Sequence, residues 1–158
     1  MEKKIQTFVN ISTFGGDINQ SIRESIHRKL SGTCDSVNGY ITEVKKEFKI
    51  TSSKISSIDC SIIFNVEATV MTIKPKINDK YQGEVVMIFE KGIFIDVKNF
   101  IKVLISFDSL NEKDYKYENL TNTFIKDDDV IEIGRLLDIE IQGVKYDKKI
   151  YNCFGNII

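Results

Sequence analysis

Proline occurs once in the 158 residues, at Pro75, and the pattern of the sequence changes there. The residues before it combine alternating apolar segments with one stretch of helical periodicity. The residues after it form a series of short alternating segments separated by glycines and charged residues. Because proline has no backbone N–H for the interior of a strand or helix, it marks a break between elements. We therefore expect two domains, at 1–77 and 78–158, each with a small core.

The first domain is predicted to begin with a strand and a helix. Apolar and polar residues alternate from Lys3 to Ser12, which is typical of a strand. Asp17 is placed to cap a helix over about 17–31, and Gly32 to end it. The apolar residues of this helix recur every four positions and form one stripe: Ile18, Ile22, Ile26 and Leu30.

Further strands are expected after this helix. Residues 39–44 are typical of a strand, and the β-branched run at 61–73 indicates the strongest strand of this half. The polar, serine-rich residues 51–57 are predicted to form a loop. The first domain is therefore expected to be an α+β unit, with the helix on one face of an antiparallel sheet.

The second domain is predicted to be all β. Strands are expected at 81–89, 93–97, 101–107, 135–144 and 149–158, with a looser polar segment at 111–122. Gly92 is expected in a tight turn and Gly143 at a β-bulge. Five short strands without a sustained helical period fit an OB barrel.

Charge and hydropathy exclude several functions. A formal net charge of −1 argues against strong, sequence-independent binding of nucleic acid, so any RNA contact is expected to be local and weak. No apolar run approaches the ~20 residues that span a membrane, so no membrane partner is expected. The residues after Met1 alternate instead of forming an apolar signal core, so secretion is not expected.

Residues suited to a metal or catalytic site are sparse. His27 is the only histidine, and it is expected to lie on the surface. Asp127, Asp128 and Asp129 carry oxygen ligands for Mg²⁺, but adjacent side chains of a turn diverge, so a solvated turn is the preferred interpretation. The cysteines form no CxxC pair: Cys34, Cys60 and Cys153. We therefore expect no cofactor, no metal and no catalytic residue.

Short motifs in both halves follow one another in an order that occurs in a known family. They are Gly32-Thr33-Cys34, Gly39-Tyr40-Ile41, Phe64-Asn65-Val66, Lys74-Pro75, Gly83 to Val86, Gly92 to Ile95 and Gly155-Asn156-Ile157. In this order and spacing the chain resembles the stalk subunit of multisubunit DNA-directed RNA polymerases, which is the seventh subunit of RNA polymerase II in eukaryotes and has a counterpart in the archaeal enzyme.

The resemblance implies a role for each domain. The first would be a tip domain of truncated ribonucleoprotein-like fold that docks on the polymerase core near the clamp. The second would be an OB-fold barrel that contacts nascent RNA. The resemblance also implies a smaller, fourth-subunit-like stalk partner and no catalytic activity.

Within the barrel, Ile93, Ile95 and Val97 are expected to point inward, which leaves Phe94 exposed for stacking on a base. The alternative is that Phe94 packs against the tip domain or a partner. Relatives often carry an aromatic residue before the turn glycine and a histidine on the third strand, where this chain has Lys91 and Ser106. The predicted RNA-binding residues are Lys91, Phe94, Lys98, Lys102 and Ser106.

The predicted docking residues on the polymerase core are Gly32, Cys34, Gly39, Asp59 and Cys60. Each also has a purely structural interpretation. The glycines can end the helix and start the next strand, and Asp59 and Cys60 can form a loop before the strong strand.

The sequence therefore predicts a non-catalytic stalk subunit of a DNA-directed RNA polymerase. A free-standing OB-fold RNA-binding protein in translation or RNA decay is the alternative, and a nuclease is a third class. The abundance of isoleucine, lysine and asparagine is typical of AT-rich coding and suggests a large DNA virus. The expected location is then the virion and host cytoplasm, or the nucleus for a cellular eukaryote.

Overall fold

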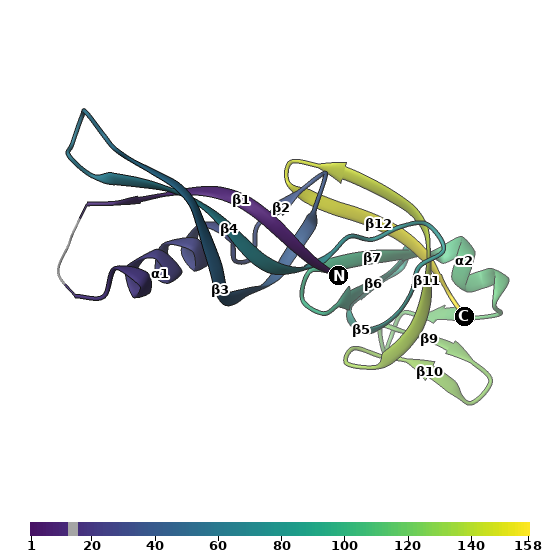
Figure 1. Ribbon diagram of the computed structural model, residues 1–158. Coiled ribbons are helices and arrows are strands. Elements are labelled where there is room, and N and C mark those ends of the chain that lie inside the picture. Colours follow the sequence, from purple (N-terminus) through teal and green to yellow (C-terminus); the bar gives the residue numbers. More distant parts are fainter. Residues whose placement is uncertain (13–15) are drawn as a thin grey trace. The chain divides into compact units, whose positions relative to one another are not determined.

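The computed structural model describes residues 1–12 and 16–158. Contacts divide the chain into two compact units, Met1–Lys74 and Pro75–Ile158 (Figure 1). This division falls at the single proline, three residues before the boundary expected at 77/78. In the residues that the structure describes, no helix is both long and apolar enough to cross a membrane.

The first unit is a four-stranded antiparallel sheet with one helix. The strands follow the order β1-β4-β3-β2 across the sheet. The elements are β1 (Glu2–Ile11), α1 (Ile18–Leu30), β2 (Cys34–Asp35), β3 (Gly39–Ile55) and β4 (Ile62–Ile73).

Helix α1 forms where the apolar periodicity predicts it. The side chain of Asp17 accepts a hydrogen bond of 2.9 Å from the backbone N–H of Asn19, which caps the helix. Ile22 and Ile26 are buried against apolar side chains of β1 and β4. Ile18 is an exception to the predicted stripe, because this first residue of the helix is 39% exposed.

The predicted loop at 51–57 is wrong for residues 51–55, and only residues 56–57 lie outside a strand. Strand β3 continues to Ile55 and pairs with β4 along its length, with three register shifts. Every residue from Thr51 to Ile55 is exposed, so no apolar alternation marks this part of the strand. Pairing with the strongly β-forming β4 overrides the weak preference of the serine-rich segment.

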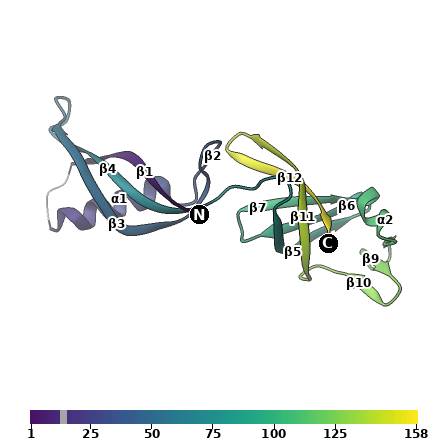
Figure 2. The ribbon, with the colours of Figure 1, turned by 45° about the vertical axis from the view of Figure 1, so that its right-hand side comes forward.

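The second unit contains a closed five-stranded barrel, as expected, in the order β11-β12-β7-β6-β5 (Figure 2). Its strands are β5 (Lys80–Phe89), β6 (Gly92–Val97), β7 (Ile101–Ser106), β11 (Leu136–Asp147) and β12 (Ile150–Ile157). Ile93, Ile95 and Val97 fill the interior with no exposed area. The expected bulge is also present, since the pairing of β11 with β12 shifts between Ile141 and Gly143.

The loose polar segment expected at 111–122 is instead partly folded. It belongs to an insert between β7 and β11, made of α2 (Phe107–Glu112), β8 (Lys116–Glu118), β9 (Thr123–Lys126) and β10 (Asp129–Ile131). Leu110, Phe124 and Ile131 are fully buried. Sequence periodicity misses these elements because each is short and its one apolar anchor is isolated.

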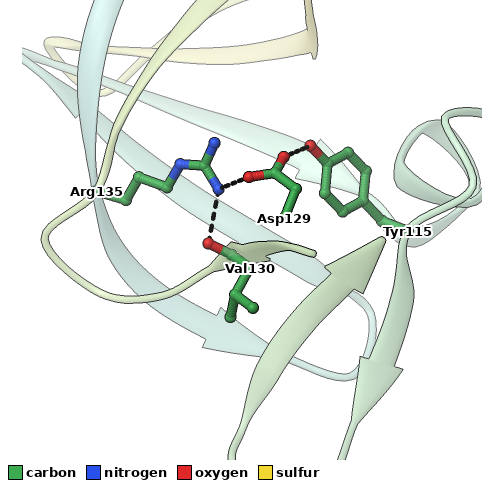
Figure 3. A network of polar contacts seen from close by, with 4 residues as sticks. All are labelled: Tyr115, Asp129, Val130 and Arg135. Atoms are coloured by element: carbon green, nitrogen blue, oxygen red, sulfur yellow. Dashed lines mark hydrogen bonds and ion pairs between the residues drawn. The ribbon is translucent and has the colours of Figure 1, made fainter. Parts of the chain in front are cut away.

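A polar network joins this insert to the start of β11 (Figure 3). Asp129 accepts hydrogen bonds from the hydroxyl of Tyr115 and from Nη1 of Arg135, which also donates to the backbone carbonyl of Val130 at 2.6 Å. The hydrogen bond from Arg135 is the main cause that lowers the pKa of Asp129. Asp129 is the first residue of β10, so the predicted solvated turn is formed only by the two aspartates before it.

Candidate nucleic-acid interface

One outward-facing row of apolar side chains crosses four barrel strands. Met87 on β5 pairs with Phe94 on β6, Phe94 pairs with Leu104 on β7, and Leu104 lies beside Phe154 on β12. Paired residues project from the same face of a sheet. We call Met87, Phe94, Leu104 and Phe154 the apolar row; at ~4.8 Å between strands it is about 14 Å long.

The apolar row is open to solvent at both ends. Met87 is 53% exposed and Phe154 is 52% exposed. Phe94 is half-buried, because the ring of Phe89 stacks on it with 5.7 Å between centroids. Gly143 on β11 lies opposite Phe154 and adds no side chain over the ring. The surface can therefore take flat apolar ligands such as nucleobases.

A second row of charged and polar side chains runs alongside the first. Asp96 on β6 pairs with Glu84 on β5 and with Lys102 on β7. Lys102 lies beside Asn152, which pairs with Lys145 on β11. The row is therefore anionic on β5 and β6 and cationic on β7 and β11. A phosphate is attracted to the side with the two lysines.

The structure brings only part of the predicted RNA site together. Phe94 and Lys102 lie on this face, and Lys98 follows directly after β6. Lys91 lies at the opposite end of β6 from Lys98. The six-residue strand between them places the two lysines about 23 Å apart at ~3.3 Å per residue. Lys91 and Lys98 do not form one continuous basic strip.

Ser106, which is predicted to bind RNA, has a structural role in the fold. Its side chain accepts a hydrogen bond of 3.2 Å from the backbone N–H of Ser109 and caps α2. The residue opposite Phe94 on β7 is Leu104, so Ser106 is not in the apolar row. Ser106 and Lys91 line a cleft of about 420 Å³ together with Glu90 and Asp108, whose carboxylates disfavour a phosphate.

Sequence reasoning missed Met87, Leu104 and Phe154 as members of this face. A signal for Phe154 is present in the sequence. Tyr151 and Cys153 are buried, so the residues between and after them face outward. Once Tyr151 and Cys153 are known to be buried, alternation assigns Phe154 to the outer face, but it does not identify the neighbours of Phe154 on other strands.

The predicted docking residues lie in two separate places of the first unit. Gly32, Cys34 and Gly39 surround the end of α1 and the start of β3, whereas Asp59 and Cys60 lie in the loop between β3 and β4. The 12-residue strand β4 runs between the two places and is about 37 Å long at ~3.4 Å per residue. They do not form one continuous surface.

Two of these residues, Gly39 and Asp59, have structural roles in the first unit. Gly39 has φ of +83°, and a Cβ atom there would lie 2.7 Å from the Cβ of Lys74. Asp59 accepts hydrogen bonds from the backbone N–H and the hydroxyl of Ser61, and the hydroxyl is the main cause that lowers the pKa of Asp59. Burial raises the pKa of the Cys34 thiol. Docking by these residues stays a prediction.

No metal site emerges from the described ranges, in which no group of three or more His, Cys, Asp and Glu side chains could hold an ion. His27 is exposed on the last turn of α1. Asp129 is engaged by Tyr115 and Arg135, as described above.

Comparison with known proteins gives one family match. The family model described as "S1 RNA binding domain" matches residues 74–152, which is half of the chain and coincides with the barrel unit. No curated protein matches the sequence.

Two solved structures show a partial likeness to the chain. The apo form of RNase R from Mycoplasma genitalium is 20% identical with a TM-score of 0.42, over 52% of this chain and 13% of that one. The solution structure of GSP13 from Bacillus subtilis is 15% identical with a TM-score of 0.38, over 55% of this chain and 58% of that one. The chain thus spans less than two thirds of either protein.

Proposed function

Since the chain belongs to the S1 RNA-binding domain family, we propose that its barrel binds single-stranded RNA across the apolar row and the lysines beside it. The observation that carries the proposal is the register of the apolar row. Two large apolar side chains, Met87 and Phe154, are more than half exposed there, and they flank a half-buried phenylalanine. Bases stack on such surfaces with little dependence on sequence.

The affinity is expected to be modest. Stacking contributes ~1–3 kcal/mol per base, and the row offers room for two or three bases. Lys98, Lys102 and Lys145 are the cations beside the row, whereas the formal net charge of the chain is −1. Three phosphate contacts give a slope of about −2 in log K against log salt, at ~0.7 per contact for a single strand.

Titration of the purified chain into a fluorescently labelled uridine octamer tests this function. We expect saturable binding that weakens with salt along this shallow slope. Absence of binding at low salt, or equal binding to a duplex of the same length, would contradict the proposal, since only unpaired bases are free to stack on the side chains of the apolar row.

A second candidate function concerns the complex in which this RNA binding takes place. We propose that the first unit anchors the chain on a DNA-directed RNA polymerase, as in the stalk subunits that the sequence resembles, and that the chain has no catalytic role. The order of the two units supports this candidate. A helix-backed antiparallel sheet precedes an S1 barrel, and the division falls at Pro75. A free-standing RNA-binding protein is the simpler interpretation of the family match.

Affinity capture of the tagged chain, followed by mass spectrometry, separates the two settings. Capture of polymerase large subunits, in salt that releases RNA, supports the stalk role. Capture of RNA alone contradicts that role and leaves RNA binding intact. Hydrolysis of RNA by the isolated chain would contradict the non-catalytic proposal.

A further inference from the structure

Asn152 lies between two lysines on the outer face of the barrel. It is exposed on β12, where its antiparallel partner on β11 is Lys145 and its parallel neighbour on β7 is Lys102. With ~4.8 Å between strands, the backbones of the two lysines are about 10 Å apart and Asn152 is midway between them. Neither lysine forms an ion pair with any residue that the structure describes. Both ammonium groups are therefore available to phosphates.

Asn152 is also next to the apolar row. Phe154 follows two positions later on the same strand, so both side chains project from one face, about 7 Å apart at ~3.4 Å per residue. Asn152 therefore has a lysine on each side and the ring of Phe154 beside it along the strand. In a nucleotide the ribose links the base to the phosphate. A nucleotide whose base stacks on Phe154 and whose phosphate meets a lysine brings its ribose close to Asn152.

The side-chain amide of Asn152 is available for a ligand. It makes no hydrogen bond with any residue in the described part of the chain. Two other amides of the barrel are engaged, since Gln82 donates to Asp138 at 3.3 Å and Gln142 donates to Glu140 at 3.1 Å. An amide carries both a donor and an acceptor, and so does a ribose 2′-hydroxyl. The two groups are therefore complementary.

We propose that Asn152 binds the ribose 2′-hydroxyl of the bound strand and makes the barrel prefer RNA to DNA; this inference rests on the proposed RNA binding. The amide nitrogen Nδ2 donates to the 2′-oxygen, or Oδ1 accepts from the 2′-hydroxyl. Stacking on the apolar row and pairing of lysines with phosphates do not discriminate, because RNA and DNA both present bases and phosphates. Discrimination requires a protein group at the ribose.

The side chains around Asn152 are less suited to this hydroxyl. Lys102 and Lys145 can only donate, and their charge draws them to the phosphates instead. Leu104 and Phe154 carry no polar atom. The phosphate, the base and the sugar are thus bound by different side chains, which makes the contribution of the sugar separable.

The test compares a uridine octamer with a 2′-deoxyuridine octamer, by fluorescence anisotropy with the full chain. The two probes share bases and phosphates, so a difference between them arises at the sugar. We expect the wild type to bind the uridine octamer about fivefold more tightly, which is the size of one neutral hydrogen bond. Asn152→Ala should bring this ratio close to unity, whatever it does to the affinity for either probe.

Asn10→Ala is the matched control, since Asn10 is an exposed asparagine on a strand of the first unit. It should keep the wild-type ratio. A 2′-fluoro octamer provides a second measurement on the wild type. Fluorine donates no hydrogen bond and accepts one poorly, but it keeps the sugar conformation of RNA. This probe should therefore bind as weakly as the deoxyuridine octamer.

An unchanged ratio in Asn152→Ala would overturn the sugar contact. Binding of the 2′-fluoro octamer as tightly as the uridine octamer would overturn it too, even if Asn152→Ala fails to fold. Equal binding of the uridine and deoxyuridine octamers by the wild type overturns the sugar contact and leaves RNA binding on the apolar row intact. Binding of neither octamer overturns both.

Discussion

Phe154 on β12 lies beside Leu104 on β7, although fifty positions separate them in the chain. The two strands are parallel, and they are the one parallel pair among the paired strands of the described residues. This pairing closes the barrel and extends the apolar row from β7 to β12. The RNA-binding surface that we propose exists only because the barrel closes.

Replacing the aromatic ring at the end of this row should weaken RNA binding. Phe154→Ala is expected to lower the affinity for a uridine octamer about 5- to 150-fold, for the loss of ~1–3 kcal/mol of stacking. Phe8→Ala is the matched control, because Phe8 is an exposed phenylalanine, 61% accessible, on the first unit. Equal losses in both variants would remove the barrel face as the binding surface.

Two of the lysines that the sequence pattern assigns to RNA should behave differently. Lys102→Gln is expected to make the slope of log K against log salt shallower by about 0.7, because one phosphate contact is lost. Lys91→Gln should leave the slope unchanged, since Lys91 lies at the far end of β6 in a cleft with Glu90 and Asp108. Affinity measured at four salt concentrations for each variant distinguishes them. An effect of Lys91→Gln alone would place the RNA at the Lys91 end of β6 instead of along the apolar row.

Gly92 should be essential for the barrel. Its φ is +152°, and a Cβ atom would collide with the backbone carbonyl of Ile105. Gly92→Ala is expected to lower the free energy of unfolding by roughly 2–4 kcal/mol. Gly143→Ala is the control, because its Cβ would lie at an ordinary 3.6 Å from the ring of Phe154. Urea unfolding can be followed by labelling of the buried thiol of Cys153, with the other two cysteines changed to serine.

The network around Asp129 should make the barrel unit sensitive to acid. The hydrogen bond from Arg135 lowers the pKa of Asp129 below 3.8, so its contribution is present above pH 3.8 and is lost as the pH falls further. Because Asp129 is 44% exposed, the effect of Asp129→Asn should be modest, about 1 kcal/mol at neutral pH. Asp128→Asn should change nothing. The free energy of unfolding in urea is measured at pH 7 and at pH 3 for both variants and the wild type. If stability falls between the two pH values by the same amount in Asp129→Asn as in the wild type, the network is not the cause of the acid sensitivity.

The buried thiol of Cys153 should make the barrel sensitive to alkali. Burial raises the pKa of Cys153 from 9.0 to about 11. The folded state therefore holds the proton more tightly, so its stability is complete below pH 9 and falls between pH 9 and 11, by about 2–3 kcal/mol. Cys153→Ala should flatten this part of the profile. A fall of the same size in the alanine variant would assign it to other groups, such as Tyr81, whose pKa is raised to about 12 mainly by burial.

Much of the fold was accessible from local patterns. The cap at Asp17, the buried face of α1 and the interior positions of β6 follow from periodicities that a few neighbouring residues define. The bulge at Gly143 was also visible. The errors fall where pairing partners decide the structure, as in the serine-rich part of β3, or where a short element has a single isolated apolar anchor, such as Phe124 in β9.

In the candidate site, too, local patterns predict some features and the pairing of strands decides the others. Alternation along one strand identifies Phe94 as an outward residue, and it does the same for Phe154 once the buried partners are known. It says nothing about which outward residue on the next strand lies opposite, because register depends on the whole sheet. For that reason the sequence does not reveal Leu104 as the neighbour of Phe94, nor the separation of Lys91 from Lys98 along β6.

The amino-acid sequence by itself determined the two units, their order and the inward face of each strong strand, because these depend on contacts between residues close in the chain. Only the tertiary structure decided which side chains share the outer face of the barrel. That arrangement depends on hydrogen-bonded register between strands far apart in sequence, and a shift by one residue would turn Phe94 or Phe154 into the core.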